Sequence, residues 1–180
     1  MGARRRRRCR TGRSRTGQSL VEFALVLPPM LLIILGIIQF GFIFNTYVTM
    51  TNATREAARI GTIYQYDGSL SKAQNDAARN TQVLISLKAS MNYLSRVAPE
   101  FTSGGTWTAS GGGLTYTNGD IVVTYTIPTG LTDNDPRTGE QITVTATYHQ
   151  PLVIPIIAAL IPHDAAGRLR LSGQVTMVIN

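Results

Sequence analysis

Cysteine and histidine are nearly absent from this 180-residue chain, which has one cysteine, Cys9, and two histidines, His149 and His163. A single cysteine excludes an intramolecular disulfide, so packing alone must hold the fold together. No second histidine or cysteine stands at the spacing of a zinc site. The run Gly111–Gly113 precedes a predicted strand rather than a helix, which is the wrong order for a phosphate-binding loop. The sequence therefore predicts no metal, no cofactor and no enzymatic activity.

Acidic side chains are missing from residues 1–16, which hold eight arginines. The whole chain has 17 basic and 10 acidic side chains and a net charge of +7, so the part after residue 16 has nine basic and ten acidic side chains, a net charge of −1. A basic folded surface would favour a nucleic-acid partner. A short tail without interleaved aromatic residues, next to an apolar run, does not, and we predict no nucleic-acid binding.

Charge is also missing from Phe23 to Phe44, a run of 22 residues whose one amide side chain is Gln39. A helix of this length measures about 33 Å and can cross a hydrocarbon core of ~30 Å. A buried helix of a soluble protein usually has a polar face, and a secretory signal has a shorter apolar core. We therefore expect a retained, single-pass transmembrane helix. The arginines before it predict a cytoplasmic N-terminus and an extracytoplasmic C-terminal part.

Two features of the apolar run require an explanation. Pro28 and Pro29 remove backbone N–H groups and crowd the preceding turn, which predicts a local kink or unwinding near residues 23–27. Glu22 lies at the cytoplasmic boundary of the run, where an unpaired carboxylate is costly. We therefore expect Glu22 to have a functional partner.

The residues before the run have an informative order, since Gly17 is followed by Gln18, then Glu22 and Phe23. This order resembles the prepilin-peptidase junction of type IV pilins and their relatives, which are cut on the cytoplasmic side and keep the apolar segment. Cleavage after Gly17 would remove all eight tail arginines and create an α-amino group at Gln18, about 6 Å along a helix from Glu22. The resemblance implies that Gly17 and Gln18 form the processing site and that Glu22 and Phe23 act in recognition and assembly. The alternative is a plain signal anchor.

Residues 17–61 resemble the N-terminal region of the TadE-like family, the minor pseudopilins of the tight-adherence (Flp-type) pilus apparatus. The resemblance rests on Gly17 with Glu22-Phe23, Leu27-Pro28, the Gly36-x-x-x-Phe40-Gly41 segment and the run from Asn52 to Arg59. It implies a pilin-like subunit in the cytoplasmic (inner) membrane or a surface pilus. Its implied partners are a prepilin peptidase, other pilins and the assembly platform. The competing hypothesis is an uncleaved, membrane-anchored binding or adhesin domain.

We expect an α+β fold with a basic leader at 1–17, a transmembrane and stalk helix at 18–63 and an extracytoplasmic domain at 64–180. A turn at 67–69 precedes a second, amphipathic helix that ends before Pro99. Its predicted seam is Leu70, Ala73, Ala77, Asn80, Leu84, Leu87, Met91 and Leu94. The seam packs on the stalk or the sheet as core, or else it mediates self-association, with Asn80 setting the register.

The remainder predicts a small antiparallel sheet. A loop or ragged edge strand at 103–113 precedes a hairpin that turns at Asn118-Gly119. Two further strands alternate, and Gly173 in the last one predicts a β-bulge. Alternating apolar positions are Ile121, Val123, Tyr125 and Ile127, then Ile142, Val144, Ala146 and Tyr148, then Leu169, Leu171, Val175 and Met177. The apolar segment 151–162 is too short to span a bilayer. Core packing is our preferred interpretation of it, with a partner-binding patch or an interfacial segment as alternatives.

Overall fold

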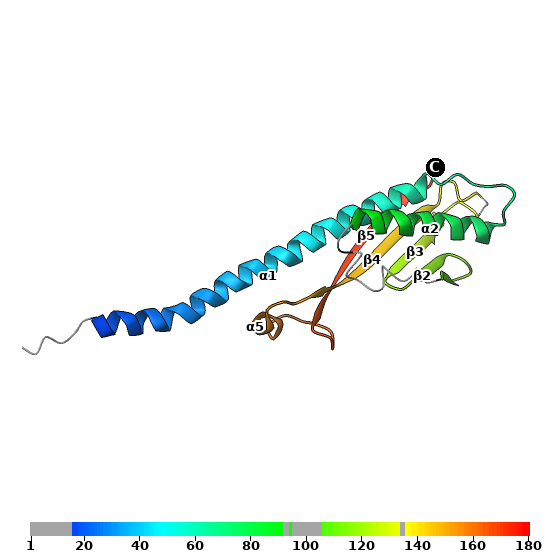
Figure 1. The fold of residues 1–180 in the computed structure, drawn as a ribbon. Helices are drawn as coiled ribbons and strands as arrows, with labels where there is room; N and C mark the ends of the chain where they lie inside the picture. Colours follow the sequence, from blue (N-terminus) through cyan, green and yellow to red (C-terminus); the bar gives the residue numbers. More distant parts are fainter. Residues whose placement is uncertain (1–15, 92–93, 95–105, 134–135) are drawn as a thin grey trace, which may run out of the picture. The chain divides into compact units, whose positions relative to one another are not determined.

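The computed structural model describes residues 16–91, 94, 106–133 and 136–180. It contains a long helix α1 (Thr16–Thr62), a second helix α2 (Lys72–Met91), a short helix α5 (Pro155–Ala158) and one antiparallel sheet (Figure 1). The predicted α+β class, with a long N-terminal helix, a second helix and a small antiparallel sheet, is confirmed. Residues 1–15 of the predicted leader lie outside the described residues.

The chain divides into two compact units, Met1–Ile38 and Gln39–Asn180, so the division falls within α1. In the first unit, α1 is helical through Pro28 and Pro29. Of the two predicted alternatives, a kink or unwinding, the unwinding is therefore wrong. A proline ring fixes φ near −65°, a value that a helix accepts, so hydrogen bonds of the flanking turns keep the chain on the helical path.

The sheet has the strand order β1-β2-β3-β4-β5, so every strand pairs with its neighbour in sequence. The strands are β1 (Thr108–Ser110), β2 (Thr115–Asn118), β3 (Ile121–Thr126), β4 (Gln141–Pro151) and β5 (Arg168–Val178). The predicted hairpin is confirmed as β2–β3. Asn118 pairs with Ile121 across the two-residue turn, where Gly119 has a positive φ of 58°.

One face of the sheet packs against both helices. The period-two alternation of β3 and β4 buries this face, because successive side chains of a strand point to opposite sides. The core combines Met50, Ala53, Ala57 and Ala58 of α1 with Val83, Leu84, Leu87 and Met91 of α2 and with Ile121, Val123, Tyr125, Ile142, Val144, Ala146 and Tyr148 of the sheet. The second part of α1 is therefore a core element of the sheet domain.

Glycine permits α1 to approach the sheet closely at two places. A Cβ atom on Gly61 would lie 2.6 Å from Cδ1 of Ile142, and one on Gly173 would lie 3.3 Å from Oγ1 of Thr54. The pairing of β4 with β5 runs without interruption through Ala146 opposite Gly173. The predicted bulge at Gly173 is therefore wrong, and the residue is small because α1 passes directly over it.

Helix α2 confirms the predicted seam only in its C-terminal half. The predicted seam residues Asn80, Leu84, Leu87 and Met91 are buried, but Ala73 is exposed and Ala77 only half-buried. The buried residues of the first half are polar: Asn75, Asp76, Arg79 and Asn80. Asn80 is fully buried and accepts a hydrogen bond from the Tyr125 hydroxyl at 2.7 Å, so it faces its own sheet and not a second copy. The predicted end of the helix before Pro99 lies outside the described residues.

Residues 151–162 run from the last residue of β4 through α5 and form the α5 segment. It contains α5 and buries one large side chain, Ile157. Val153, Ile156 and Leu160 are 67%, 59% and 73% exposed. Core packing is therefore the wrong interpretation for most of this segment.

Candidate functional site

The predicted processing junction lies at the start of α1. Gly17 is the second residue of the helix, and Gln18 and Glu22 stand four residues apart on one helix face. The side-chain amide of Gln18 donates to Oε1 of Glu22 at 3.3 Å, and both side chains are exposed. The structure therefore brings the two residues together as their spacing requires.

Gly17 and Phe23 take no part in that contact. A Cβ atom on Gly17 would meet nothing within 4 Å, so packing among the described residues does not require glycine there. Phe23 is 62% exposed at the start of the apolar run. Glu22 is the seventh residue of α1 and lies beyond its first turn. Cleavage after Gly17 would make it the fifth residue of the chain, closer to the positive end of the helix dipole.

The apolar part of α1 exposes large side chains around its circumference. Leu25, Ile33 and Ile37 are 76%, 64% and 67% exposed, although they are fully apolar. A helix that is apolar on all sides needs an apolar surrounding. Among the described residues, one helix is long and apolar enough to cross a membrane, over Gly17–Thr62. Its length and composition support a single-pass membrane anchor.

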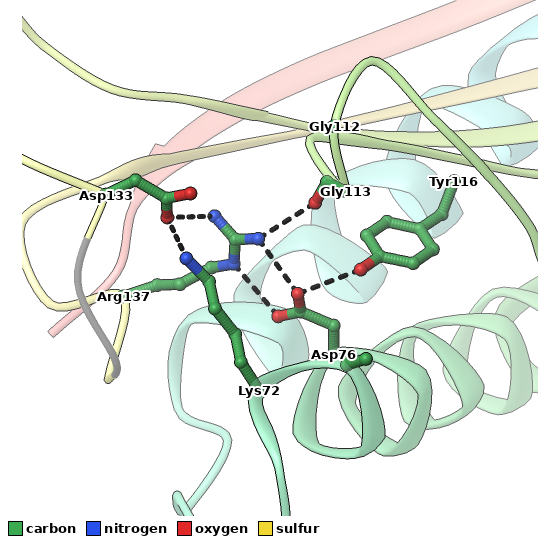
Figure 2. A pocket seen from close by; sticks show the side chains of 8 residues that line it. Lys72, Asp76, Gly112, Gly113, Tyr116, Asp133 and Arg137 are labelled. Carbon is green, nitrogen blue, oxygen red and sulfur yellow. Dashed lines mark hydrogen bonds and ion pairs between the residues drawn. The ribbon is translucent and has the colours of Figure 1, made fainter.

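A second candidate site lies far along the chain, under the loop between β3 and β4. Arg137 is 2% exposed and donates from Nε and Nη2 to the two oxygens of Asp76, both at 2.9 Å (Figure 2). Its Nη1 donates to Glu140 at 2.8 Å and to Asp133 at 3.1 Å, and its Nη2 also donates to the Gly113 carbonyl at 2.9 Å. All five guanidinium donors are thus used.

The acceptors around Arg137 come from separate elements. Asp76 lies on α2, Gly113 precedes β2, and Glu140 and Asp133 lie in the loop before β4. Lys72, at the start of α2, forms an ion pair with Asp133, and the Tyr116 hydroxyl donates to Asp76 at 3.0 Å (Figure 2). The Arg137 guanidinium also lies 4.3 Å from the centre of the Tyr125 ring. One side chain therefore joins α2, the β1–β2 turn and the β3–β4 loop.

The charges in this cluster stabilise one another. Burial disfavours the charged form of Arg137, but hydrogen bonds to Asp76 and Glu140 outweigh it and raise the pKa of Arg137. The hydrogen bond from Lys72 lowers the pKa of Asp133 despite its partial burial. Burial and the neighbouring Asp76 raise the pKa of Tyr116 to about 12. Arg137, Asp133 and Tyr116 therefore each keep the protonation state that they normally have at neutral pH. The buried hydrogen bonds of Arg137 make the cluster a structural clamp.

The sequence does not predict this cluster. The one local indication of it in the sequence is the pair Asp76 and Arg79. These two charged residues, three positions apart, interrupt the apolar face of α2. No local pattern connects that pair with Arg137, 61 residues further along the chain. Among the described residues, no group of three or more His, Cys, Asp or Glu side chains could hold a metal ion.

These features define a class: a sheet domain whose core includes residues 50–58 of a helix that is long and apolar enough to anchor the protein in a membrane. Residues 17–59 match the family described as TadE-like protein, and the predicted resemblance is confirmed over that range. The match starts at the junction glycine and ends on the part of α1 that packs on the sheet. Neither the curated proteins nor the solved structures compared with the chain gave a match. The TadE-like segment lies wholly on α1, whose length and apolar composition support a membrane anchor.

Proposed function

We propose that this chain is a minor pilin-like subunit, a pseudopilin, of a tight-adherence pilus. In this proposal a prepilin peptidase cuts after Gly17, and the mature chain is held in the inner membrane by α1 with its sheet domain outside the cytoplasm. It then acts with other pilins and the assembly platform in pilus assembly and surface adherence. We expect no catalytic activity.

The observation that carries the proposal is the position of the family match, which begins on Gly17 and follows α1 as far as Arg59. The geometry supports it in two ways. The junction is exposed, so a membrane peptidase can reach it. The spacing of Gln18 and Glu22 supports it as well, because an α-amino group created at Gln18 would lie about 6 Å along the helix axis from a carboxylate.

The mass of the protein extracted from membranes tests cleavage. Expression beside a prepilin peptidase should give a chain that begins at Gln18 and has lost all eight leader arginines. Gly17→Val should keep the leader, because a branched side chain replaces hydrogen at the cut while the described structure offers room for it. Gly41→Ala, another open position on α1, is the matched control and should be cut normally. A wild-type chain that retains Arg4 to Arg8 would contradict the proposal and favour the uncleaved anchored binding domain.

Glu22→Ala separates processing from assembly. This variant should still be cut after Gly17, because the cut lies five residues away, but it should not support piliation, because the new α-amino group loses its carboxylate. Glu22→Gln keeps the shape and hydrogen-bonding capacity of the side chain without its charge, and it should fail in the same way. Normal pilus numbers in both variants, counted by electron microscopy, would remove the assembly role of the carboxylate.

A further inference from the structure

The α5 segment is an apolar surface without charge. Residues 151–162 contain no charged or polar side chain, and Val153, Ile156 and Leu160 are each more than half exposed. Single exposed apolar residues are ordinary on a protein surface. Three large ones on a segment of twelve residues are a patch, and such patches mark contact with a partner or a membrane.

The α5 segment is attached to α1 at one side chain. Oε1 of Gln39 accepts hydrogen bonds from the backbone N–H groups of Val153 at 3.0 Å and Ile154 at 3.3 Å. Gln39 is fully buried beneath the segment. The side-chain hydroxyl of Thr46, two helical turns further along α1, donates to Gln150 at 2.6 Å. The end of β4 and the α5 segment therefore run beside α1 between Thr46 and Gln39.

The contact with Gln39 lies within the apolar run of α1, the part of the helix that is expected to cross the membrane. Gln39 is the one amide in the charge-free run from Phe23 to Phe44, and it lies five residues before the end of that run. Five residues of helix correspond to about 7.5 Å along the axis. The contact with the α5 segment therefore lies about 7.5 Å, measured along the helix axis, on the N-terminal side of the point where the apolar run ends.

The backbone of the α5 segment is suited to such a depth. In an apolar medium, each unpaired N–H group costs several kcal/mol. Pro151, Pro155 and Pro162 have no N–H group. The N–H groups of residues 157–161 all donate to carbonyls within the segment, at 3.0 to 3.3 Å, and Gln39 accepts from residues 153 and 154. Most of the backbone donors are satisfied without water.

We propose that the α5 segment inserts into the outer leaflet of the bilayer that α1 spans, as a second, monotopic membrane contact. A lipid surface is the favoured occupant because the segment is attached to α1 inside its own apolar run, where lipid is the surrounding medium. The inference rests on α1 crossing a membrane, and it does not depend on cleavage at Gly17 or on pilus assembly.

Depth-dependent fluorescence quenching tests the proposal. The full-length chain with Cys9→Ser is reconstituted into vesicles of phosphatidylcholine and phosphatidylglycerol, and an environment-sensitive fluorophore is attached to Leu160→Cys. The matched control is Ile85→Cys on α2, which is also apolar and 61% exposed. Ile33→Cys, within the apolar run and 64% exposed, reports that α1 is in the membrane. The quenchers are lipids spin-labelled high in the acyl chain and aqueous iodide.

We expect spin-labelled lipid to quench the probe at Leu160 at least threefold more than the probe at Ile85, and iodide to show the opposite order. Equal quenching at the two positions, with the probe at Ile33 protected from iodide, would overturn the proposal while leaving α1 in the membrane. Protection at Leu160 that disappears at less than one protein per vesicle would assign the patch to a second copy, which also overturns it. The readout does not involve processing, so its failure is distinct from failure of the proposed function.

Discussion

Arg137 is predicted to be the side chain on which the sheet domain depends most. Arg137→Met keeps much of the aliphatic volume but leaves Asp76 and Glu140, 2% and 1% exposed, without their main partner. Removing one member of a buried ion pair costs about 3–5 kcal/mol, because the other charge stays desolvated. Arg137→Lys keeps the charge but not the five planar donors, so its loss should be intermediate.

The assay is thermal unfolding of the detergent-solubilised full chain. Trp107 is the one tryptophan of the chain and packs against the core beside β1, so its fluorescence follows the domain. For a unit of about 140 residues, 1 kcal/mol corresponds to about 3 °C, which predicts a Tm lower by about 10–15 °C for Arg137→Met. Arg59→Met breaks an exposed ion pair with Glu56 and should leave the Tm unchanged.

A double-mutant cycle makes the test specific. Arg137→Met and Asp76→Asn disrupt the same contacts, so the double variant should be less destabilised than the sum of the two single variants. If Arg137→Met unfolds within 2 °C of the wild type, or if the two changes simply add, the guanidinium is not the clamp described above.

Two further predictions concern the same domain. Gly61→Ala should lower the free energy of unfolding by about 1–3 kcal/mol, because its Cβ would lie 2.6 Å from Ile142 and 3.0 Å from Val83. Adding Ile142→Val removes Cδ1 of Ile142, the nearer of the two atoms, and should recover part of the loss in the same unfolding assay. The pKa of Asp133 is lowered in the folded state, chiefly by the hydrogen bond from Lys72, so its contribution to stability is present above its unfolded pKa of about 3.9 and is lost as pH falls through the lower folded value. Unfolding temperatures measured from pH 6 to pH 2 should therefore fall less steeply for Asp133→Asn than for the wild type, and equal slopes would refute this role of the carboxylate.

Local periodicity was sufficient to predict the helices and strands. The alternation of Ile142, Val144, Ala146 and Tyr148 predicts a buried strand face because the strand period is two, and all four are buried in β4. The contact between Gln18 and Glu22 follows from helical spacing alone. The contact between Gln18 and Glu22 and the long apolar helix could therefore be predicted from short stretches of sequence.

The errors arose where a residue's role depends on a distant partner. The predicted seam of α2 omits Asp76, because its partner Arg137 is remote in sequence. Gly173 fits a bulge as well as a close approach, and only the position of α1 over β5 decides between them. Core packing was predicted for the α5 segment because the segment is apolar. The sequence alone does not show that its backbone binds Gln39, which lies within the apolar run of α1.

The helix α1 contains both the apolar anchor and part of the core of the sheet domain. Met50, Ala53, Ala57 and Ala58 belong to the same core cluster as the strands, while the residues before Gln39 form the apolar anchor. Residues 50–58 of the helix therefore cannot leave the sheet without exposing the apolar core that they share with the strands.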